Sequence, residues 1–348
     1  MADEQAQPKS NPGGIGRIIA WLGGIVLVLA LLAAGAAFAG WTWVNQQFEM
    51  AGPAGPDQTV QLPRGAGLIA IANQLEREAL ISDARIFRAM VTIDGGDRDL
   101  RAGEFAIPEA ASMAEIYDIL RSGNTIQHPI TAAEGLTSAM IVEIVRGADV
   151  LTGEITAIPP EGSLLPETYL VDRGTSRQGV LDRMADAQNA LLDELWETRS
   201  DNLPFETREE ALILASIVEK ETAEGDERPL VAAVFVNRLR RGMRLQTDPT
   251  IIYGITQGEP LGRGIRRSEI DDASNPYNTY QINGLPPTPI ANPGRDAIAA
   301  VLNPPESNYL FFVADGSGGH AFSETYEEHN RNVQNWRRIE RERARSGG

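Results

Sequence analysis

The stretch Leu212–Ala223, LILASIVEKETA, changes within a few residues from an apolar segment to charged side chains. Every residue from 211 to 218 is apolar or small. A helix made of this segment is therefore apolar on all sides, and we predict that it lies inside a domain. The segment then ends in Glu219, Lys220 and Glu221. This pattern predicts a carboxylate held at the end of a buried helix.

Glu219 is the carboxylate that helical geometry favours. It shares a stripe with Ala215 and Ser216, whose small side chains leave an open floor beneath it. Desolvation by apolar walls raises the pKa of a carboxyl group, and a raised pKa suits a general acid near neutral pH. Lys220 and Glu221 point elsewhere on the helix and are predicted to face solvent. The alternative is that Glu219 only ends a buried helix and pairs with a nearby cation.

The composition argues against several classes of function. The chain has 348 residues, 42% of them hydrophobic, which is enough for more than one domain. Its formal net charge of -17 speaks against nucleic acid as a partner, because binding phosphates requires a basic surface. Cysteine is absent and the 3 histidines are scattered, so we predict no thiolate chemistry, no metal site and no cofactor.

An apolar segment near the N-terminus predicts a membrane anchor. No charged residue lies between Arg17 and Glu49, and residues 18–40 are long enough to cross a bilayer core as a helix. Lys9 and Arg17 precede the segment, so the positive-inside rule places the N-terminus in the cytoplasm and the rest of the chain outside it. A cleaved signal peptide is the alternative, because residues 37–39 (AFA) resemble a cleavage site. The apolar run is longer than a usual signal sequence, which favours the anchor.

The region after the anchor predicts a small module of strands and helices. Thr59–Leu62 alternates like a strand, and Leu68–Leu80 has helical spacing. Asp83 caps a second helix that runs through Val91, and Glu104–Ile107 has the pattern of a returning strand. The predicted order is strand, helix, helix, strand.

The remaining sequence predicts further helices and a hairpin. Ser112 and Glu115 match a capping box, as do Thr207 and Glu210, and each pair introduces a helix. The other predicted elements are helices at 177–198, 208–222 and 229–241, loops from 246 to 293, and a hairpin of strands 309–315 and 320–322. The chain is therefore predicted to belong to the α+β class.

Motifs in the second half of the chain resemble those of the endolytic murein transglycosylases, the MltG or YceG-like family. They are EGSLLPETY (161–169), LASIVEKETA (214–223), LQTDPTIIYG (245–254), NPYNTYQINGLPPTPIANPG (275–294) and YLFFVADGSGGHAFSETYEEHN (309–330). The resemblance extends from the membrane anchor to about Arg337, and the motifs occur in the family's order. In that family the Glu of the EKE segment is catalytic, and the resemblance assigns this role to Glu219.

The resemblance also implies an order of domains. The family's fold has a LysM-like module ahead of an α+β YceG-like catalytic domain, which agrees with the strands and helices predicted at 59–107. The predicted organisation is a cytoplasmic N-terminus (1–17), a transmembrane anchor (18–40), a linker (41–57), a LysM-like glycan-binding region (58–155), a catalytic transglycosylase domain (156–340) and a disordered tail (341–348).

The reaction that the resemblance implies is cleavage between N-acetylmuramic acid and N-acetylglucosamine within glycan strands. The product is a 1,6-anhydro sugar, and such cleavage can terminate strand elongation. Glycosidases usually need two carboxyl groups, but a lytic transglycosylase uses the C6 hydroxyl of the sugar as nucleophile, so one Glu can act as acid and then as base. The alternatives are a hydrolytic muramidase and a non-catalytic glycan-binding scaffold of the cell-wall synthesis machinery.

Further residues are predicted to bind the substrate. Asp248 is the second carboxylate candidate, as a positioning or charge-stabilising group, with a structural role in a turn as the alternative. The others offer amides, hydroxyls and rings that suit sugars, and they are Gln246, Tyr253, Asn278, Thr279, Tyr280 and His320. Asn, Pro and Gly in these loops also specify turns, so a purely structural role stays open for each residue.

The implied partners are peptidoglycan glycan strands and the peptidoglycan synthases that make them. The family acts on nascent strands near the membrane, which a short linker on a single anchor suits. The predicted location is the bacterial inner (cytoplasmic) membrane, crossed once, with the catalytic domain in the periplasm.

Overall fold

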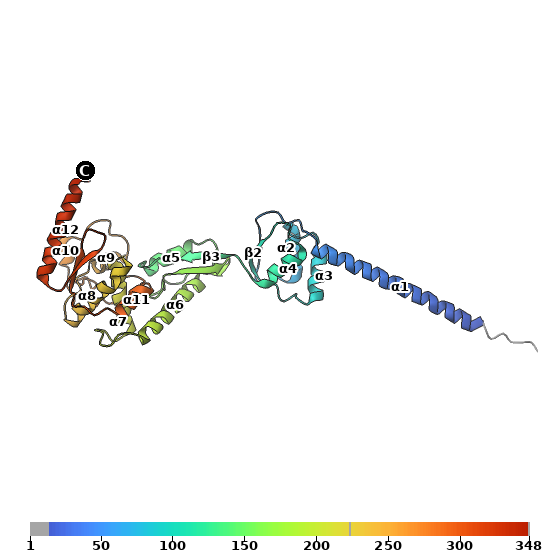
Figure 1. The fold of residues 1–348 in the computed structure, drawn as a ribbon, viewed down its shortest axis with the longest axis horizontal. Coiled ribbons are helices and arrows are strands. Elements are labelled where there is room, and N and C mark those ends of the chain that lie inside the picture. Colours follow the sequence, from blue (N-terminus) through green and yellow to red (C-terminus); the bar gives the residue numbers. More distant parts are fainter. Residues whose placement is uncertain (1–13, 223, 347–348) are drawn as a thin grey trace, which may run out of the picture. The chain divides into compact units, whose positions relative to one another are not determined.

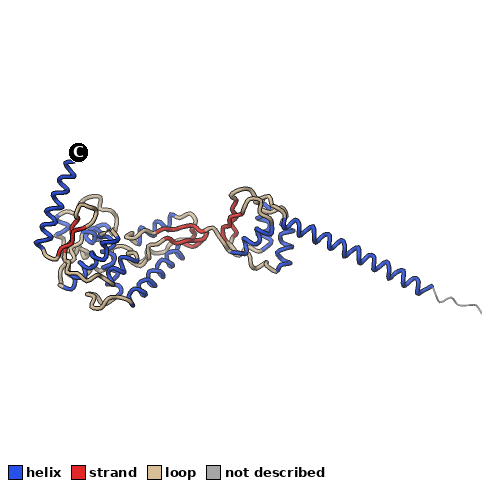
Figure 2. Tube along the Cα trace, viewed as in Figure 1, coloured by secondary structure: helices blue, strands red, loops and turns tan. Residues whose placement is uncertain are grey.

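The computed structural model describes residues 14–222 and 224–346. The chain divides into two compact units, and the division lies between Ile126 and Gln127 (Figure 1). In both units the described strands form two-stranded pairs that pack with helices (Figure 2). This is the mixed α+β architecture that the sequence predicts.

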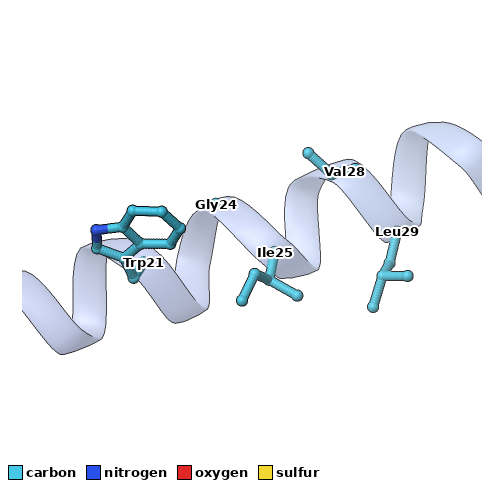
Figure 3. A pocket seen from close by; sticks show the side chains of 5 residues that line it. All are labelled: Trp21, Gly24, Ile25, Val28 and Leu29. Atoms are coloured by element: carbon cyan, nitrogen blue, oxygen red, sulfur yellow. The ribbon is translucent and has the colours of Figure 1, made fainter.

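Helix α1 (Gly14–Glu49) carries the apolar segment of the first unit. Its part Trp21–Glu49 has 29 residues and a mean hydropathy of 2.5, and 0% of its most apolar window is buried. By length and composition this helix suits a membrane span, although a signal sequence has the same properties. A hollow of about 540 Å³ lies beside Trp21 and Gly24, and Figure 3 shows the residues that line it. It is lined by residues of α1 alone, where Gly24 leaves a gap between aliphatic side chains, so we assign no function to it.

Helix α1 continues beyond the predicted span of 18–40. Residues 41–49, predicted to be linker, are its last turns. Phe48 is buried in the core of the first unit, with its ring centroid 6.4 Å from that of Phe87. The end of the apolar helix is thus part of a folded unit, because an aromatic side chain there gains more from burial than from exposure. The first 13 residues of the predicted cytoplasmic N-terminus lie outside the described part.

The first unit contains the predicted order of strand, helix, helix and strand. These elements are β1 (Gln58–Leu62), α2 (Leu68–Arg77), α3 (Ala84–Asp94) and β2 (Gly103–Ile107), followed by α4 (Met113–Ser122). The two strands pair antiparallel. Asp83 caps α3 by accepting from two backbone N–H groups, and Ser112 forms the predicted capping box with Glu115 at the start of α4. The predicted order of elements, the Asp83 cap and the capping box are confirmed.

The second unit begins earlier than the predicted boundary between residues 155 and 156. Strand β3 (Gln127–Thr131) pairs antiparallel with β5 (Thr168–Asp172), so residues 127–155 fold with the C-terminal part of the chain. The other elements here are α5 (Ser138–Gly147), the short parallel pair β4 (Leu151–Thr152) and β6 (Thr175–Ser176), and α6 (Arg177–Glu197). The boundary moves because strand pairing ties together segments that are distant in sequence, which local patterns do not reveal.

The centre of the second unit consists of helices that pack on one another (Figure 1). Helix α7 (Arg208–Glu221) begins with the predicted capping box and packs against α8 (Arg228–Arg240) and α11 (Arg295–Leu302). Most of its apolar segment is fully buried, as predicted. A short 3-10 helix, η1 (Gly225–Glu227), leads into α8.

The segment predicted as loops from 246 to 293 contains two helices, α9 (Asp248–Thr256) and α10 (Arg267–Ile270). The start of α9 has a sequence signal, since proline follows Asp248 and proline is favoured in the first turn of a helix.

The C-terminal elements are the predicted hairpin and a final helix. Strand β7 (Phe311–Ala314) pairs antiparallel with β8 (His320–Ser323), which confirms the hairpin. Helix α12 (Tyr326–Ser346) packs on both strands, and it is drawn in red in Figure 1. It extends through residues 341–346, which were predicted to be a disordered tail, and residues 347–348 lie outside the described part.

Candidate active site

A pocket of about 500 Å³ opens in the second unit at the C-terminal end of α7. Residues from α7, α8, α9, β7 and α12 contribute to its lining. The polar lining residues are Glu221, Arg238, Gln246, Asp248, Tyr280 and His329, and the apolar and aromatic ones are Phe235, Leu245, Phe311, Phe312, Val313 and Tyr326. A cavity of this size, with a few polar groups among rings and aliphatic side chains, is typical of a ligand site.

Glu221 is the last residue of α7, and its carboxyl group lines the pocket. The hydroxyl of Thr247 donates a hydrogen bond to Oε1 of Glu221. The pKa of Glu221 is raised to about 7, chiefly by burial and also by the negative charge of Asp248. The Thr247 hydrogen bond, His320 and Arg238 act in the opposite direction. A carboxyl group with a pKa near 7 can both give and accept a proton at neutral pH.

A second carboxylate, Asp248, lines the same pocket at the start of α9. The hydroxyl of Tyr280 donates a hydrogen bond of 2.8 Å to its Oδ1. Burial raises the pKa of Tyr280, and its bond to Asp248 adds to the rise. Tyr280 therefore remains a hydrogen-bond donor at neutral pH and orients Asp248 toward the pocket.

The loop before α9 is held in place by a buried threonine. Thr279, predicted to bind substrate, is 0% exposed. Its hydroxyl accepts from the N–H of Thr247 at 3.0 Å, and its carbonyl accepts from the N–H of Gln246 at 3.2 Å. Gln246 itself has a φ of 53°, a conformation that non-glycine residues adopt only with support from their surroundings. Thr279 thus positions the residues that reach Glu221 and the pocket.

Asn278, also predicted to bind substrate, has a similar supporting role. Its side chain is 0% exposed, and its Nδ2 donates to the carbonyls of Glu269, Ile270 and Asp272 at 2.8 to 3.1 Å. Its Oδ1 accepts from the N–H of Tyr280 at 3.1 Å. Asn278 therefore closes the loop that carries Tyr280 and does not line the pocket.

Glu219, predicted to be the acid, lies outside the pocket lining. Its side chain is 5% exposed, and Oε1 is 3.5 Å from the guanidinium of Arg228. Oε2 accepts from the N–H of Gly294 at 3.0 Å. Burial raises the pKa of Glu219, while the Gly294 bond and the charge of Arg228 lower it. These contacts match the alternative drawn from the sequence, in which Glu219 ends a buried helix beside a cation.

The position of Glu219 outside the pocket has a geometric cause. The stripe of Ala215, Ser216 and Glu219 was predicted to leave an open floor, but a loop covers it. The Ser216 hydroxyl accepts from the N–H of Ile290, and Glu219 binds Gly294 in the same segment. Glu221 is two residues further along the helix, about 200° around its axis, and so faces the other side, where the pocket lies.

Tyr253 and His320 do not line the pocket. The hydroxyl of Tyr253, which is 7% exposed, donates to Oε2 of Glu161 at 3.3 Å. His320 is held by Glu227, whose carboxylate accepts from the His320 backbone N–H at 2.7 Å and lies 2.6 Å from its ring Nδ1. Of the predicted binding residues, Gln246, Asp248 and Tyr280 line the pocket, and the other four support the structure around it.

A family model described as the YceG-like family matches residues 60–335. The chain belongs to the YceG-like family. Among curated proteins it is similar to an endolytic murein transglycosylase of Streptococcus pneumoniae, with 30% identity over 88% of this chain and 63% of the relative. It is also similar to an endolytic murein transglycosylase of Bacillus subtilis, with 29% identity over 78% of this chain and 82% of the relative. The chain thus spans less than two thirds of the pneumococcal protein's length.

Among solved structures, the chain is similar to a crystal structure of a YceG-like protein from Listeria monocytogenes. The match has 29% sequence identity and a TM-score of 0.48, and it covers 79% of this chain and 98% of the other.

In this YceG-like chain, sequence reasoning missed three polar residues that line the pocket, Glu221, Arg238 and His329. It also missed Thr247, which donates to Glu221. Glu221 was visible as the second acid of EKE, but the helical wheel alone does not tell which face meets a loop and which meets a cavity. Nothing in the sequence near Arg238 indicated that it lines a pocket. A buried arginine needs specific partners, and those of Arg238 are backbone carbonyls that only the fold brings near it. Its Nε donates to the carbonyl of Leu310 at 2.7 Å, and one terminal nitrogen donates to that of Leu245 at 2.7 Å.

Proposed function

We propose that this chain is a membrane-anchored endolytic lytic transglycosylase that cleaves bonds between N-acetylmuramic acid and N-acetylglucosamine in peptidoglycan strands, with Glu221 as its acid and base. Membership of the YceG-like family and the names of the relatives support the reaction class. The observation that carries the residue assignment is the carboxyl of Glu221, whose pKa burial raises to about 7 and which lines a pocket of about 500 Å³.

One carboxyl group suffices for this chemistry. Protonated Glu221 gives its proton to the glycosidic oxygen as the bond from that oxygen to C1 breaks. The C6 hydroxyl of the same muramic acid attacks C1, and the Glu221 carboxylate takes the hydroxyl proton. The products are a 1,6-anhydro end and a free hydroxyl on the released strand, and Glu221 is again protonated.

Asp248 supports this step from the same pocket. Positive charge develops at the sugar ring in the transition state of glycoside cleavage, and a carboxylate nearby stabilises it. Tyr280, which donates to Asp248, keeps that carboxylate in one orientation. The negative charge of Asp248 also favours the protonated form of Glu221, which is the form that begins the reaction.

The anchor and the first unit fit an enzyme that works at the membrane. We propose that α1 crosses the inner membrane once and leaves the catalytic unit in the periplasm, with Lys9 and Arg17 on the cytoplasmic side. The order β1, α2, α3, β2 supports a LysM-like glycan-binding module. An enzyme tethered in this way acts on nascent strands near peptidoglycan synthases, and its cuts terminate strand elongation.

Mass spectrometry of products from purified glycan strands tests the reaction class. We expect each cut to yield an anhydromuramic acid end, because the C6 hydroxyl replaces water as the nucleophile. Reducing ends, heavier by one water, would identify a hydrolytic muramidase instead. Strands left intact by the full-length protein would favour the glycan-binding scaffold.

Cleavage is expected to slow as the pH rises above about 7. The pKa of Glu221 is raised to about 7, and a general acid must hold its proton, so kcat/KM is expected to fall about tenfold per pH unit above that value. In Asp248→Asn the neighbouring negative charge is gone, which lowers the pKa of Glu221 and moves the alkaline limb to lower pH. The measurement is the pH profile of kcat/KM for both proteins. An alkaline limb at the same pH in both would argue against this coupling.

A further inference from the structure

A group of three rings in the pocket lining is not used by the acid–base chemistry. Phe311 belongs to β7, and Tyr326 and His329 belong to the first turn of α12. The ring centroids of Phe311 and His329 are 5.1 Å apart and the rings are stacked, with an interplanar angle of 22°. Tyr326 lies 6.0 Å from Phe311 and 6.4 Å from His329. Residues 326 and 329 are one helical turn apart, so α12 presents both to the same side.

Tyr326 is unusually exposed for its type. Its relative exposure is 65%, and in the described part of the second unit no other Phe, Tyr or Trp is more than about a third exposed. Single exposed apolar side chains are common and need no explanation. This one lines a pocket beside two other rings, which is the composition of a surface that binds an amphipathic ligand.

His329 brings an unmet hydrogen-bonding capacity to the same wall. Its Nδ1 is buried and has no hydrogen-bond partner among the described residues. Burial lowers the pKa of the imidazole, and the charge of Arg238 lowers it further, so the ring is neutral at neutral pH. A neutral imidazole has one donor and one acceptor nitrogen, and leaving such groups unpaired is unfavourable.

We propose that Tyr326 and His329, backed by Phe311, form a subsite for one pyranose ring of the glycan strand. Tyr326 covers the apolar face of the sugar, and His329 forms a hydrogen bond with a hydroxyl or acetamido group of the same sugar. The inference rests on the proposed function, because it takes the ligand to be the strand that is cut at Glu221. The subsite fixes which sugar lies beside the acid.

Hydrogen–deuterium exchange of the full-length protein in detergent tests the subsite locally. The probe is the β-1,4-linked hexamer of N-acetylglucosamine, and the readout is protection of peptides covering 309–333, which is separate from any protection in the first unit. We expect Tyr326→Ala to raise the concentration for half-protection about tenfold, the effect of losing one aromatic contact. Tyr326→Phe is expected to bind like the wild type. His329→Phe keeps a ring on Phe311 and is expected to weaken binding about fivefold.

Leu170→Ala is the matched control, because Leu170 is 54% exposed on β5 and does not line the pocket. It should bind the hexamer like the wild type. Absence of protection at 309–333 in the wild type, or equal midpoints for the wild type and Tyr326→Ala, overturns the subsite. If the protection depends on Tyr326 but the protein leaves strands uncut, the proposed function fails and the subsite stands.

Discussion

Glu221→Gln is expected to lower the rate of strand cleavage by a factor of roughly 10²–10⁴, the usual contribution of general acid–base catalysis. Gln has almost the same shape as Glu and can still accept the Thr247 hydrogen bond, so the fold should be kept. It has no acidic proton to give to the leaving oxygen. The measurement is release of short strands from purified glycan, followed by chromatography.

Glu219→Gln is the matched control, because it makes the same substitution two residues before Glu221 on the same helix. Glu219 binds Arg228 and the loop at Gly294 and does not line the pocket. We expect its replacement to leave most of the activity, with a modest loss of stability. The reverse pattern, an active Glu221→Gln and an inactive Glu219→Gln, would return the acid to the position that the sequence alone favoured.

The elements that local patterns define could be predicted from the sequence. The burial of α7, the capping boxes at Ser112 and Thr207, and the hairpin of β7 and β8 depend on residues close together in the chain. The boundary between the units could not be predicted, because it depends on the pairing of β3 with β5 across the intervening α5.

The candidate site could be predicted only to within a helical turn. The EKE segment reaches the cavity through Glu221, but the side of α7 that faces the cavity could not be predicted, because it depends on residues 290–294, which pack on the opposite side. Composition also misled for Asn278 and Thr279. Amide and hydroxyl side chains can bind sugars, but they can equally bind the backbone of a loop. Here Asn278 donates to a loop carbonyl, and the hydroxyl of Thr279 accepts from a backbone N–H.

Arg228→Met is expected to lower the free energy of unfolding at pH 7 by about 3–5 kcal/mol, the usual result of removing one partner of a buried ion pair. The Arg228 side chain is 9% exposed and that of Glu219 is 5% exposed, with 3.5 Å between their charged atoms. Methionine fills much of the volume but leaves the Glu219 carboxylate without its cation. The measurement is urea unfolding followed by tryptophan fluorescence.

Two comparisons separate the lost charge from lost packing. Adding Glu219→Gln to Arg228→Met removes the stranded charge, so the double variant should regain part of the stability. The folded-state pKa of Glu219 is raised above its unfolded value by burial, and removing Arg228 raises it further. Such a group binds more protons in the folded state, so its stabilising protonation is lost as the pH rises through the folded pKa. The gap between Arg228→Met and the wild type should therefore narrow toward pH 5. A gap that stays constant with pH, together with a double variant less stable than Arg228→Met, would mean that Arg228 acts through packing and not through the charge of Glu219.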